Sequence, residues 1–182
     1  MVDATNVLRR EHHDIAAVVL MAEEMLLRRM ADPNIGIRDM PEMTNFFLRY
    51  ADHLHHAKEE SVLFPAVLRH QPESLTLLDV LLEEHQQIRA ILATLEQALS
   101  RGQRDAYFET VRAYIAVMHQ HLAREEGQLL PLADQLFSPE EQQQLAAQLA
   151  AVQEERMPST EVSDWQHWSR QAATVSAGST TK

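Results

Sequence analysis

The sequence predicts an all-α protein: an antiparallel up-down-up-down four-helix bundle of two helical hairpins, with an extra C-terminal helix and a polar tail. Apolar residues recur at the helical period along nearly the whole chain, and no stretch alternates convincingly at the period of two typical of a strand. Gly (4) and Pro (7) are scarce among the 182 residues, which disfavours a turn-rich β fold. An internal repeat relates the first pair of helices to the second.

Turn-forming residues divide the chain into five predicted helices. The breaks are the run Pro33-Asn34-Ile35-Gly36, the Gln71-Pro72 step, the Arg101-Gly102 step and the Ser138-Pro139 step, where Ser is the expected N-cap. They delimit helices at about 3–31, 39–70, 73–100, 103–137 and 139–156. The first four are each about 28 to 35 residues long, or ~40–50 Å, and their short connections predict antiparallel neighbours.

These boundaries also predict the domain organisation. We expect residues 1–137 to form the four-helix bundle, residues 138–157 an appended C-terminal helix, and residues 158–182 a loosely held polar tail. The tail is polar and ends in Ser and Thr, although Trp165 and Trp168 offer a way to pin part of it to the bundle.

Composition excludes several classes of function. Cys is absent, which rules out disulfide scaffolds, thiolate metal sites and thiol nucleophiles. The net charge is −11, and Lys occurs only at Lys58 and Lys182, so the chain lacks the clustered cations that a nucleic acid rewards. The N-terminal residues are polar, and the longest apolar run, Ala16–Ala22, is far shorter than the ~20 residues of a membrane span. We expect a cytoplasmic protein with no membrane and no nucleic-acid partner.

The internal repeat is the most informative feature of the sequence. Leu-Arg-Arg-Glu-His-His-Asp-Ile at 8–15 resembles Leu-Leu-Glu-Glu-His-Gln-Gln-Ile at 81–88. Likewise, His-His-Ala-Lys-Glu-Glu-Ser-Val-Leu-Phe-Pro at 55–65 resembles His-Leu-Ala-Arg-Glu-Glu-Gly-Gln-Leu-Leu-Pro at 121–131. The same polar residues therefore recur at matched places in both hairpins, inside stripes that are otherwise apolar.

The repeated polar residues predict a metal site in the bundle core. Residues four apart share one helix face, so each repeated His-x-x-x-Glu points both side chains inward. A buried unpaired carboxylate costs several kcal/mol and needs partners or a cation. Imidazoles and carboxylates without thiolate suit iron, manganese or zinc, and two Glu from facing helices can bridge two ions. The six candidate ligands are His12, His55, Glu59, His85, His121 and Glu125.

This pattern resembles the hemerythrin family, specifically the hemerythrin-like HHE cation-binding domains, over about residues 5–137. The six candidate ligands carry the resemblance, together with Glu-Glu-x-x-Leu-Phe-Pro at 59–65 and its echo at 125–131. The resemblance implies a non-haem centre of two iron ions, bridged by Glu59 and Glu125 and capped by histidines. It also implies a small diatomic ligand, oxygen or nitric oxide, and a role in sensing, storage or stress response.

The sequence departs from oxygen-carrying hemerythrins at two places. These proteins have a His-x-x-x-His pair on the third helix, whereas His85 is followed at that spacing by Arg89. They also have an Asp, spaced one residue further, where this chain has Glu125. Fewer histidines predict a more open or more symmetric site. His56 is a candidate for an extra ligand, although its repeat partner is Leu122.

Two other readings of the site stay open at this point. A di-iron redox enzyme, for peroxide or nitric oxide detoxification or for iron–sulfur cluster repair, would use the open coordination position. A structural bundle with a vestigial site is the third hypothesis.

The remaining polar residues of the repeat are expected to lie outside the ligand set. His53 and His119 point largely away from the ligands, and Glu60 and Glu126 are interpreted as charges on the outer face. The other histidines, His13, His70 and His167, are expected to face solvent.

Overall fold

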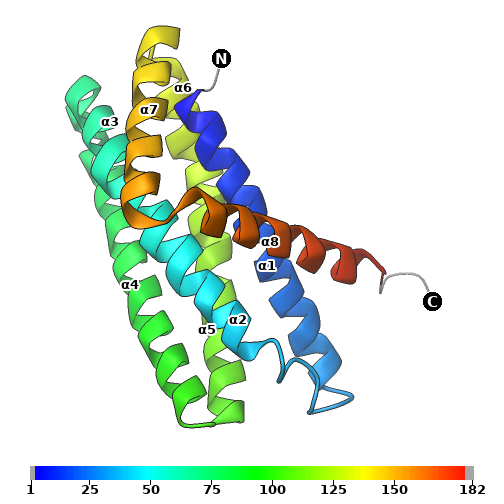
Figure 1. Ribbon diagram of the computed structural model, residues 1–182. Coiled ribbons are helices and arrows are strands. Elements are labelled where there is room, and N and C mark those ends of the chain that lie inside the picture. Colours follow the sequence, from blue (N-terminus) through cyan, green and yellow to red (C-terminus); the bar gives the residue numbers. More distant parts are fainter. Residues whose placement is uncertain (1–2, 179–182) are drawn as a thin grey trace.

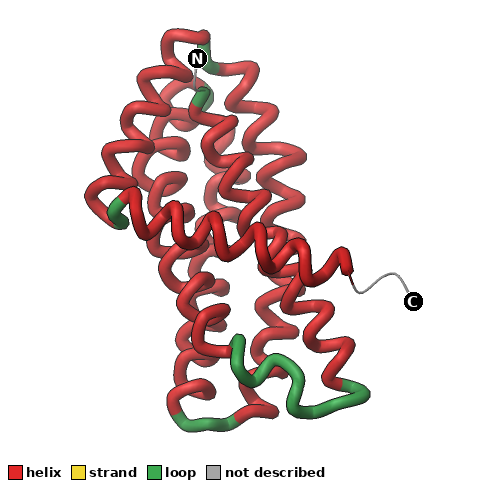
Figure 2. Tube along the Cα trace, turned by 45° about the vertical axis from the view of Figure 1, so that its right-hand side comes forward, coloured by secondary structure: helices red, strands yellow, loops and turns green. Residues whose placement is uncertain are grey.

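The computed structural model describes residues 3–178, and over this range the chain is helical with no β-strand. The long helices lie side by side as a helical bundle, and one further helix crosses its face (Figure 1). Viewed from a second direction, the connections are short except for the loop of residues 30–39 (Figure 2). The predicted all-α class is confirmed.

The first hairpin consists of α1 (Ala4–Arg29) and a second helical segment that begins after the loop. Gly36 has a φ of 79° in that loop, a left-handed conformation that glycine adopts without strain. The second segment contains α2 (Met40–Asn45), the π-helical stretches η1 (Phe46–His56) and η2 (Glu59–Leu63), and α3 (Phe64–His70).

The second hairpin repeats this plan after the short 3₁₀ turn η3 (Pro72–Ser74). It consists of α4 (Leu75–Ser100), a tight turn in which Gly102 has a φ of 65°, and a segment made of three parts. These parts are α5 (Arg104–Arg124), the π-helical stretch η4 (Glu125–Leu129) and α6 (Leu130–Leu136).

The π-helical stretches were not predicted from the sequence, which indicated continuous α-helices. At the ends of η2 and η4 the amides of Phe64 and Leu130 bond to carbonyls five residues back, those of Glu59 and Glu125. A proline follows one residue later in each case, and proline lacks an N–H and crowds the turn before it. The wider turns therefore come just before each proline, and each begins at a predicted bridging glutamate.

Helix α7 (Pro139–Arg156) coincides with the predicted helix at 139–156. Its N-terminus is a capping box, because the Ser138 side chain accepts from the Glu141 amide and the Glu141 side chain accepts from the Ser138 amide. The helix packs against α1, η1 and η2.

The segment expected to be a loosely held tail contains a helix, α8 (Ser159–Gly178), that crosses α1 and η1 (Figure 1). Trp165 and Trp168 pack on Phe46 with ring centroids 5.9 and 5.5 Å apart. Ser169 is buried and donates to Asp14. A narrow apolar stripe among polar residues gives the helix its attachment, so the tail expectation does not hold for these residues. Residues 179–182 of that expected tail lie outside the described residues.

Two apolar clusters fill the interior and leave a polar layer between them. Each of the four long helical segments of the two hairpins has apolar side chains in both clusters. The repeated polar residues lie on each segment between its two apolar stretches. One cluster includes Ile15, Leu54, Ile88 and Met118, and the other includes Leu8, Val62, Leu81 and Leu129. Within the described residues, none of the helices combines the length and apolarity needed to cross a membrane.

Candidate metal centre

The polar layer brings all six predicted ligands and His56 together in the buried interior. Each of these side chains is 5% or less exposed. Histidines come from α1, η1, α4 and α5, and the two glutamates are the first residues of η2 and η4. The seven residues are His12, His55, His56, Glu59, His85, His121 and Glu125.

One half of this layer is formed by His12 and His55. Their Nε2 atoms lie 3.1 Å apart. Glu59 Oε1 lies 3.8 Å from the first of these atoms and 3.5 Å from the second. Glu125 Oε2 lies 3.3 Å from His12 Nε2. The ligand atoms of these four residues all lie within 4.8 Å of one another, a spacing that suits a single cation.

The other half is formed by three histidines, His56, His85 and His121, with Glu59. Their ligand atoms also lie within 4.8 Å of one another. Glu59 Oε2 is 3.5 Å from His85 Nε2, so the two oxygens of Glu59 face different halves. Glu125 lies between the halves as well, because its Oε2 is 3.3 Å from His121 Nε2 and from His12 Nε2.

Most of the candidate ligand atoms at the centre have no hydrogen-bond partner, the exceptions being the Nε2 atoms of His12 and His55, which lie 3.1 Å apart. Both oxygens of Glu59 and of Glu125 are buried and unbonded, as are the Nε2 atoms of His56, His85 and His121. Buried polar atoms are almost always satisfied in folded proteins, and an unpaired buried carboxylate is especially costly. Seven converging orphan atoms of imidazole and carboxylate type fit a pair of cations.

Each of the five histidines points Nε2 inward and Nδ1 at a carboxylate. A carboxylate oxygen lies close to Nδ1 in each case: Glu126 at 2.6 Å from His12, Glu11 at 3.0 Å from His55, Asp52 at 3.2 Å from His56, Glu60 at 2.7 Å from His85, and Glu84 at 3.2 Å from His121. A carboxylate accepting from Nδ1–H fixes the ring orientation and leaves Nε2 free to coordinate, which is the usual support for a metal-ligating histidine.

The supporting carboxylates repeat the internal symmetry. Glu11 accepts from His55 and from the fully buried Lys58, while its counterpart Glu84 accepts from His121 and from Arg124. Sequence reasoning missed these pairs. The signal was present in the repeat, since a glutamate directly precedes both His12 and His85 and a cation directly precedes both central glutamates.

The cluster's electrostatics follow from its burial and its two central carboxylates, Glu59 and Glu125. Burial lowers the pKa of His12 and His85, but carboxylates, Glu125 foremost, outweigh this and raise it, for His85 to about 11. Burial and neighbouring imidazoles lower the pKa of His56, and burial lowers that of His121. Burial raises the pKa of the central carboxyls, yet the facing histidines hold it below the usual range. Protons therefore balance the carboxylates when no metal is bound.

The other repeat residues divide into two groups. Glu60 and Glu126, interpreted as outer-face charges, accept from His85 and His12 and so touch ligand candidates through Nδ1. All the other histidines have exposed side chains: His13, His53, His70, His119 and His167.

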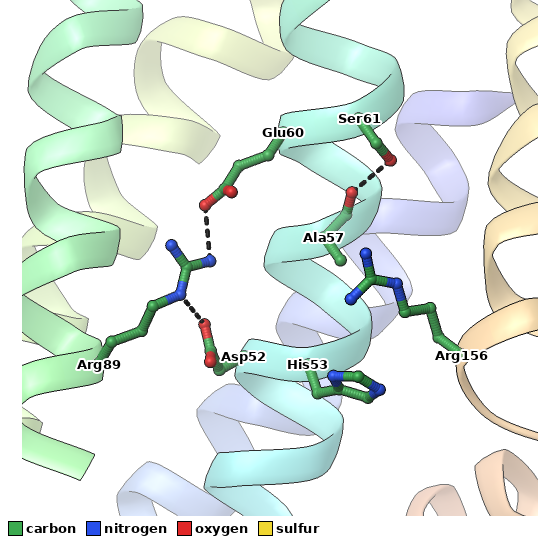
Figure 3. A pocket seen from close by; sticks show the side chains of 7 residues that line it. All are labelled: Asp52, His53, Ala57, Glu60, Ser61, Arg89 and Arg156. Atoms are coloured by element: carbon green, nitrogen blue, oxygen red, sulfur yellow. Dashed lines mark hydrogen bonds and ion pairs between the residues drawn. The ribbon is translucent and has the colours of Figure 1, made fainter. Parts of the chain in front are cut away.

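Two cavities flank the layer on different sides. A cavity of about 400 Å³ lies outside the His56 half, where Arg89 reaches Asp52 and Glu60 (Figure 3). A cavity of about 340 Å³ lies outside the other half and is lined by Arg9, His12, His13, Ala16, Leu122 and Glu126.

Comparison with known proteins agrees with this chemistry. A family model described as the hemerythrin HHE cation binding domain matches residues 3–133. Uncharacterized proteins of Mycobacterium tuberculosis and Mycobacterium bovis are 27% identical over 152 residues, which is 80% of this chain and 59% of the relative. An uncharacterized protein of Haemophilus influenzae is 28% identical over 94 residues, 50% of this chain and 54% of its own length. The chain thus spans less than two thirds of the relatives it matches, and no solved structure matches it significantly.

Proposed function

The chain belongs to the hemerythrin HHE cation-binding domain family, and from that premise we propose that it is a cytoplasmic non-haem di-iron protein. In this proposal the two iron ions bind oxygen or nitric oxide, in sensing, storage or stress response. The four long helical segments form an up-down-up-down bundle, and each hairpin contributes one pair of repeat-matched histidines. The observation that carries the proposal is the set of seven orphaned imidazole and carboxylate atoms in the buried layer.

The proposed ligand set divides the site into unequal halves. His12 and His55 serve one ion, and His56, His85 and His121 serve the other. Glu59 and Glu125 lie between the halves and bridge the ions. The 4.8 Å grouping supports this division, since Glu59 belongs to both groups. The half with two histidines has the open coordination position.

Iron at such a site supplies reversible binding of a diatomic molecule with a change of oxidation state. The chain itself supplies three things. The apolar clusters on either side keep bulk water away from the layer. The Nδ1 partners hold each imidazole with Nε2 pointing inward. The carboxylates raise the pKa of His12 and His85, and these imidazoles would have to lose a proton to bind a cation through Nε2, so metal binding would release protons.

In this proposal the open coordination position lies in the half formed by His12 and His55, where it would serve ligand binding and redox turnover alike. The enzyme hypothesis depended on a coordination position left open where Arg89 replaces a histidine of oxygen-carrying hemerythrins. His56 lies in the group on that side, in contact with the His85 ring at a centroid distance of 4.0 Å. The missing histidine of the third helix predicted fewer histidines on that side of the site. The structure instead groups three histidines there.

Anaerobic loading with ferrous iron tests the proposal. The protein is expected to retain about two iron ions per chain and to develop near-ultraviolet and visible absorption that changes when oxygen or nitric oxide is added. Replacing both Glu59 and Glu125 by Ala should abolish iron retention, whereas His53→Ala, at an exposed histidine near the site, should not. Iron-free wild-type protein after loading, or iron retained equally by the double variant, would contradict the proposal.

A further inference from the structure

Arg89 closes a ring of contacts around two of the proposed ligands. Its Nε donates to Asp52 Oδ1 at 2.8 Å and its Nη2 donates to Glu60 Oε1 at 2.7 Å (Figure 3). Those same oxygens lie 3.2 Å from His56 Nδ1 and 2.7 Å from His85 Nδ1. The ring closes inside the protein, where the two imidazoles stack at 4.0 Å with their planes 16° apart.

The ring depends on the planar guanidinium of Arg89. Asp52 and Glu60 lie two turns apart on one helical path, and Arg89 reaches both from α4 (Figure 3). One rigid fork thus fixes two carboxylates, and each carboxylate fixes one imidazole. An ammonium group is a point charge and cannot present the same two divergent N–H groups.

The matched positions of the other half lack this ring. By the repeat, Ala16 stands where Arg89 stands, Met118 where Asp52 stands and Leu122 where His56 stands. Arg9 approaches Glu126 there, but at 3.7 Å, and its closer partner is Asp134 at 2.6 Å. Glu126 holds His12 without a second bridged histidine.

We propose that Arg89 is a positioning residue that makes His56 a metal ligand, by orienting His56 and His85 together through Asp52 and Glu60. The inference rests on the proposed metal site. Oxygen-carrying hemerythrins have a histidine ligand at the position of Arg89, so a comparison of the sequences alone indicates only that a ligand is missing. The proposal gives Arg89 a role of its own at that position. The ligand is recovered from the neighbouring helix, and Arg89 holds it in place.

Titration of the chelator-treated protein with Co²⁺, followed by absorption, tests this role. Arg89→Met is expected to weaken the binding of one of two ions by about 10–100-fold, the range typical when the partner of a metal ligand is lost. Arg89→Lys keeps the positive charge and should also weaken the binding of that ion, because the planar guanidinium with its paired N–H donors is lost. Arg9→Met, at the arginine that approaches Glu126 in the other half, should stay within about twofold of wild type. Equal affinities in Arg89→Met and Arg9→Met would overturn the proposal.

A double-mutant cycle separates positioning from general destabilisation. If Arg89 acts through His56, the losses of Arg89→Met and His56→Leu will not add, since each removes the same ligand. Additive losses would mean that Arg89 acts elsewhere, and would overturn the proposal.

The metal-free protein gives a readout that does not depend on metal binding. Nitrogen-15 NMR of the imidazoles should show His56 with its proton on Nδ1, and Arg89→Met should shift it toward a mixture of tautomers. If wild-type protein binds no Co²⁺, the di-iron proposal fails, yet a shifted tautomer still supports the role of Arg89 and an unchanged one overturns it. Arg89→Lys provides the same comparison if Arg89→Met does not fold.

Discussion

The two halves of the candidate site share one frame but differ at three matched positions. Both have a histidine from the first helix of a hairpin, a His-x-x-x-Glu from the second, and a further glutamate that pairs with a histidine and a cation. They differ because one half has Arg89, Asp52 and His56 where the other has apolar residues. Three matched differences thus turn a symmetric frame into a three-histidine half and a two-histidine half.

A few substitutions in a duplicated frame are enough to make the candidate site asymmetric. A symmetric pair of half-sites would offer the same open position twice. Here the half near Arg89 is filled by imidazoles, and the half near Ala16 and Leu122 borders a cavity of about 340 Å³. Incoming small ligands are therefore expected to react at the half formed by His12 and His55.

The largest effect is expected at the residue that belongs to both halves. Glu59→Ala removes a carboxylate whose two oxygens face different halves, so both ions should be lost, with metal content falling from about two per chain toward none. Glu125→Ala should lower the metal content less, because His56, His85, His121 and Glu59 still form a complete group of four ligands without it. Metal analysis by mass spectrometry measures both. Equal losses in the two variants would refute the distinction between the glutamates.

Making the halves alike should have the next largest effect. His56→Leu copies the residue at the matched position, Leu122. It is expected to lower the affinity for one of the two ions by about 10–100-fold. Isothermal titration with Co²⁺ should then show two sites of similar affinity. Leu122→Ala is the matched control and should leave affinity within about twofold of wild type. Unchanged binding in His56→Leu would place His56 outside the ligand set.

The cations that pair with Glu11 and Glu84 should differ in their effect on stability. Lys58→Met leaves Glu11 buried with one charged partner fewer and is expected to cost about 3 kcal/mol or more. Arg124→Met should cost about 1 kcal/mol, since the Arg124 side chain is 29% exposed and water can replace it at Glu84. Urea denaturation with chelator present measures both free energies of unfolding. A larger loss at Arg124 would contradict this reading of burial.

The smallest effect is a pH dependence of the metal-free protein. The folded-state pKa of His85 is raised to about 11, because its carboxylate partners outweigh the effect of burial. Its contribution to stability is thus full below the unfolded value of about 6.5 and declines as pH rises toward 11. The urea midpoint should fall between pH 7 and pH 9. His56→Leu should show the same slope, since the His56 pKa is lowered and that ring is neutral across this window. A midpoint that rises over this range would contradict the assignment.

Much of the fold and of the site could be predicted from the sequence, because helical periodicity and a repeat are local signals. The start of α7 was predictable from Ser138 as the N-cap and Pro139 as the first helical residue, while the capping box also needs Glu141. His56 was predictable only as a candidate ligand, because its proposed role depends on a side chain from another helix, Arg89, closing a ring with Asp52. The π-helical turns were hidden as well, since proline predicts a disturbed turn without specifying its register.

The helix α8 shows a different limit of sequence reasoning. Its apolar contacts come from a few widely spaced residues, with Trp165 and Trp168 packing on Phe46. A stripe so narrow does not stand out from a polar background, and its partner lies far away in the sequence. The polarity of the segment indicated a loose tail that Trp165 and Trp168 could pin in part, whereas the structure has a helix packed along α1 and η1.

Anomalous diffraction at the iron absorption edge, from crystals of the iron-loaded protein, tests the central claim most directly. Two iron peaks are expected in the buried layer, one among His12, His55, Glu59 and Glu125 and the other among His56, His85, His121 and Glu59. A single peak, or peaks outside this layer, would contradict that claim.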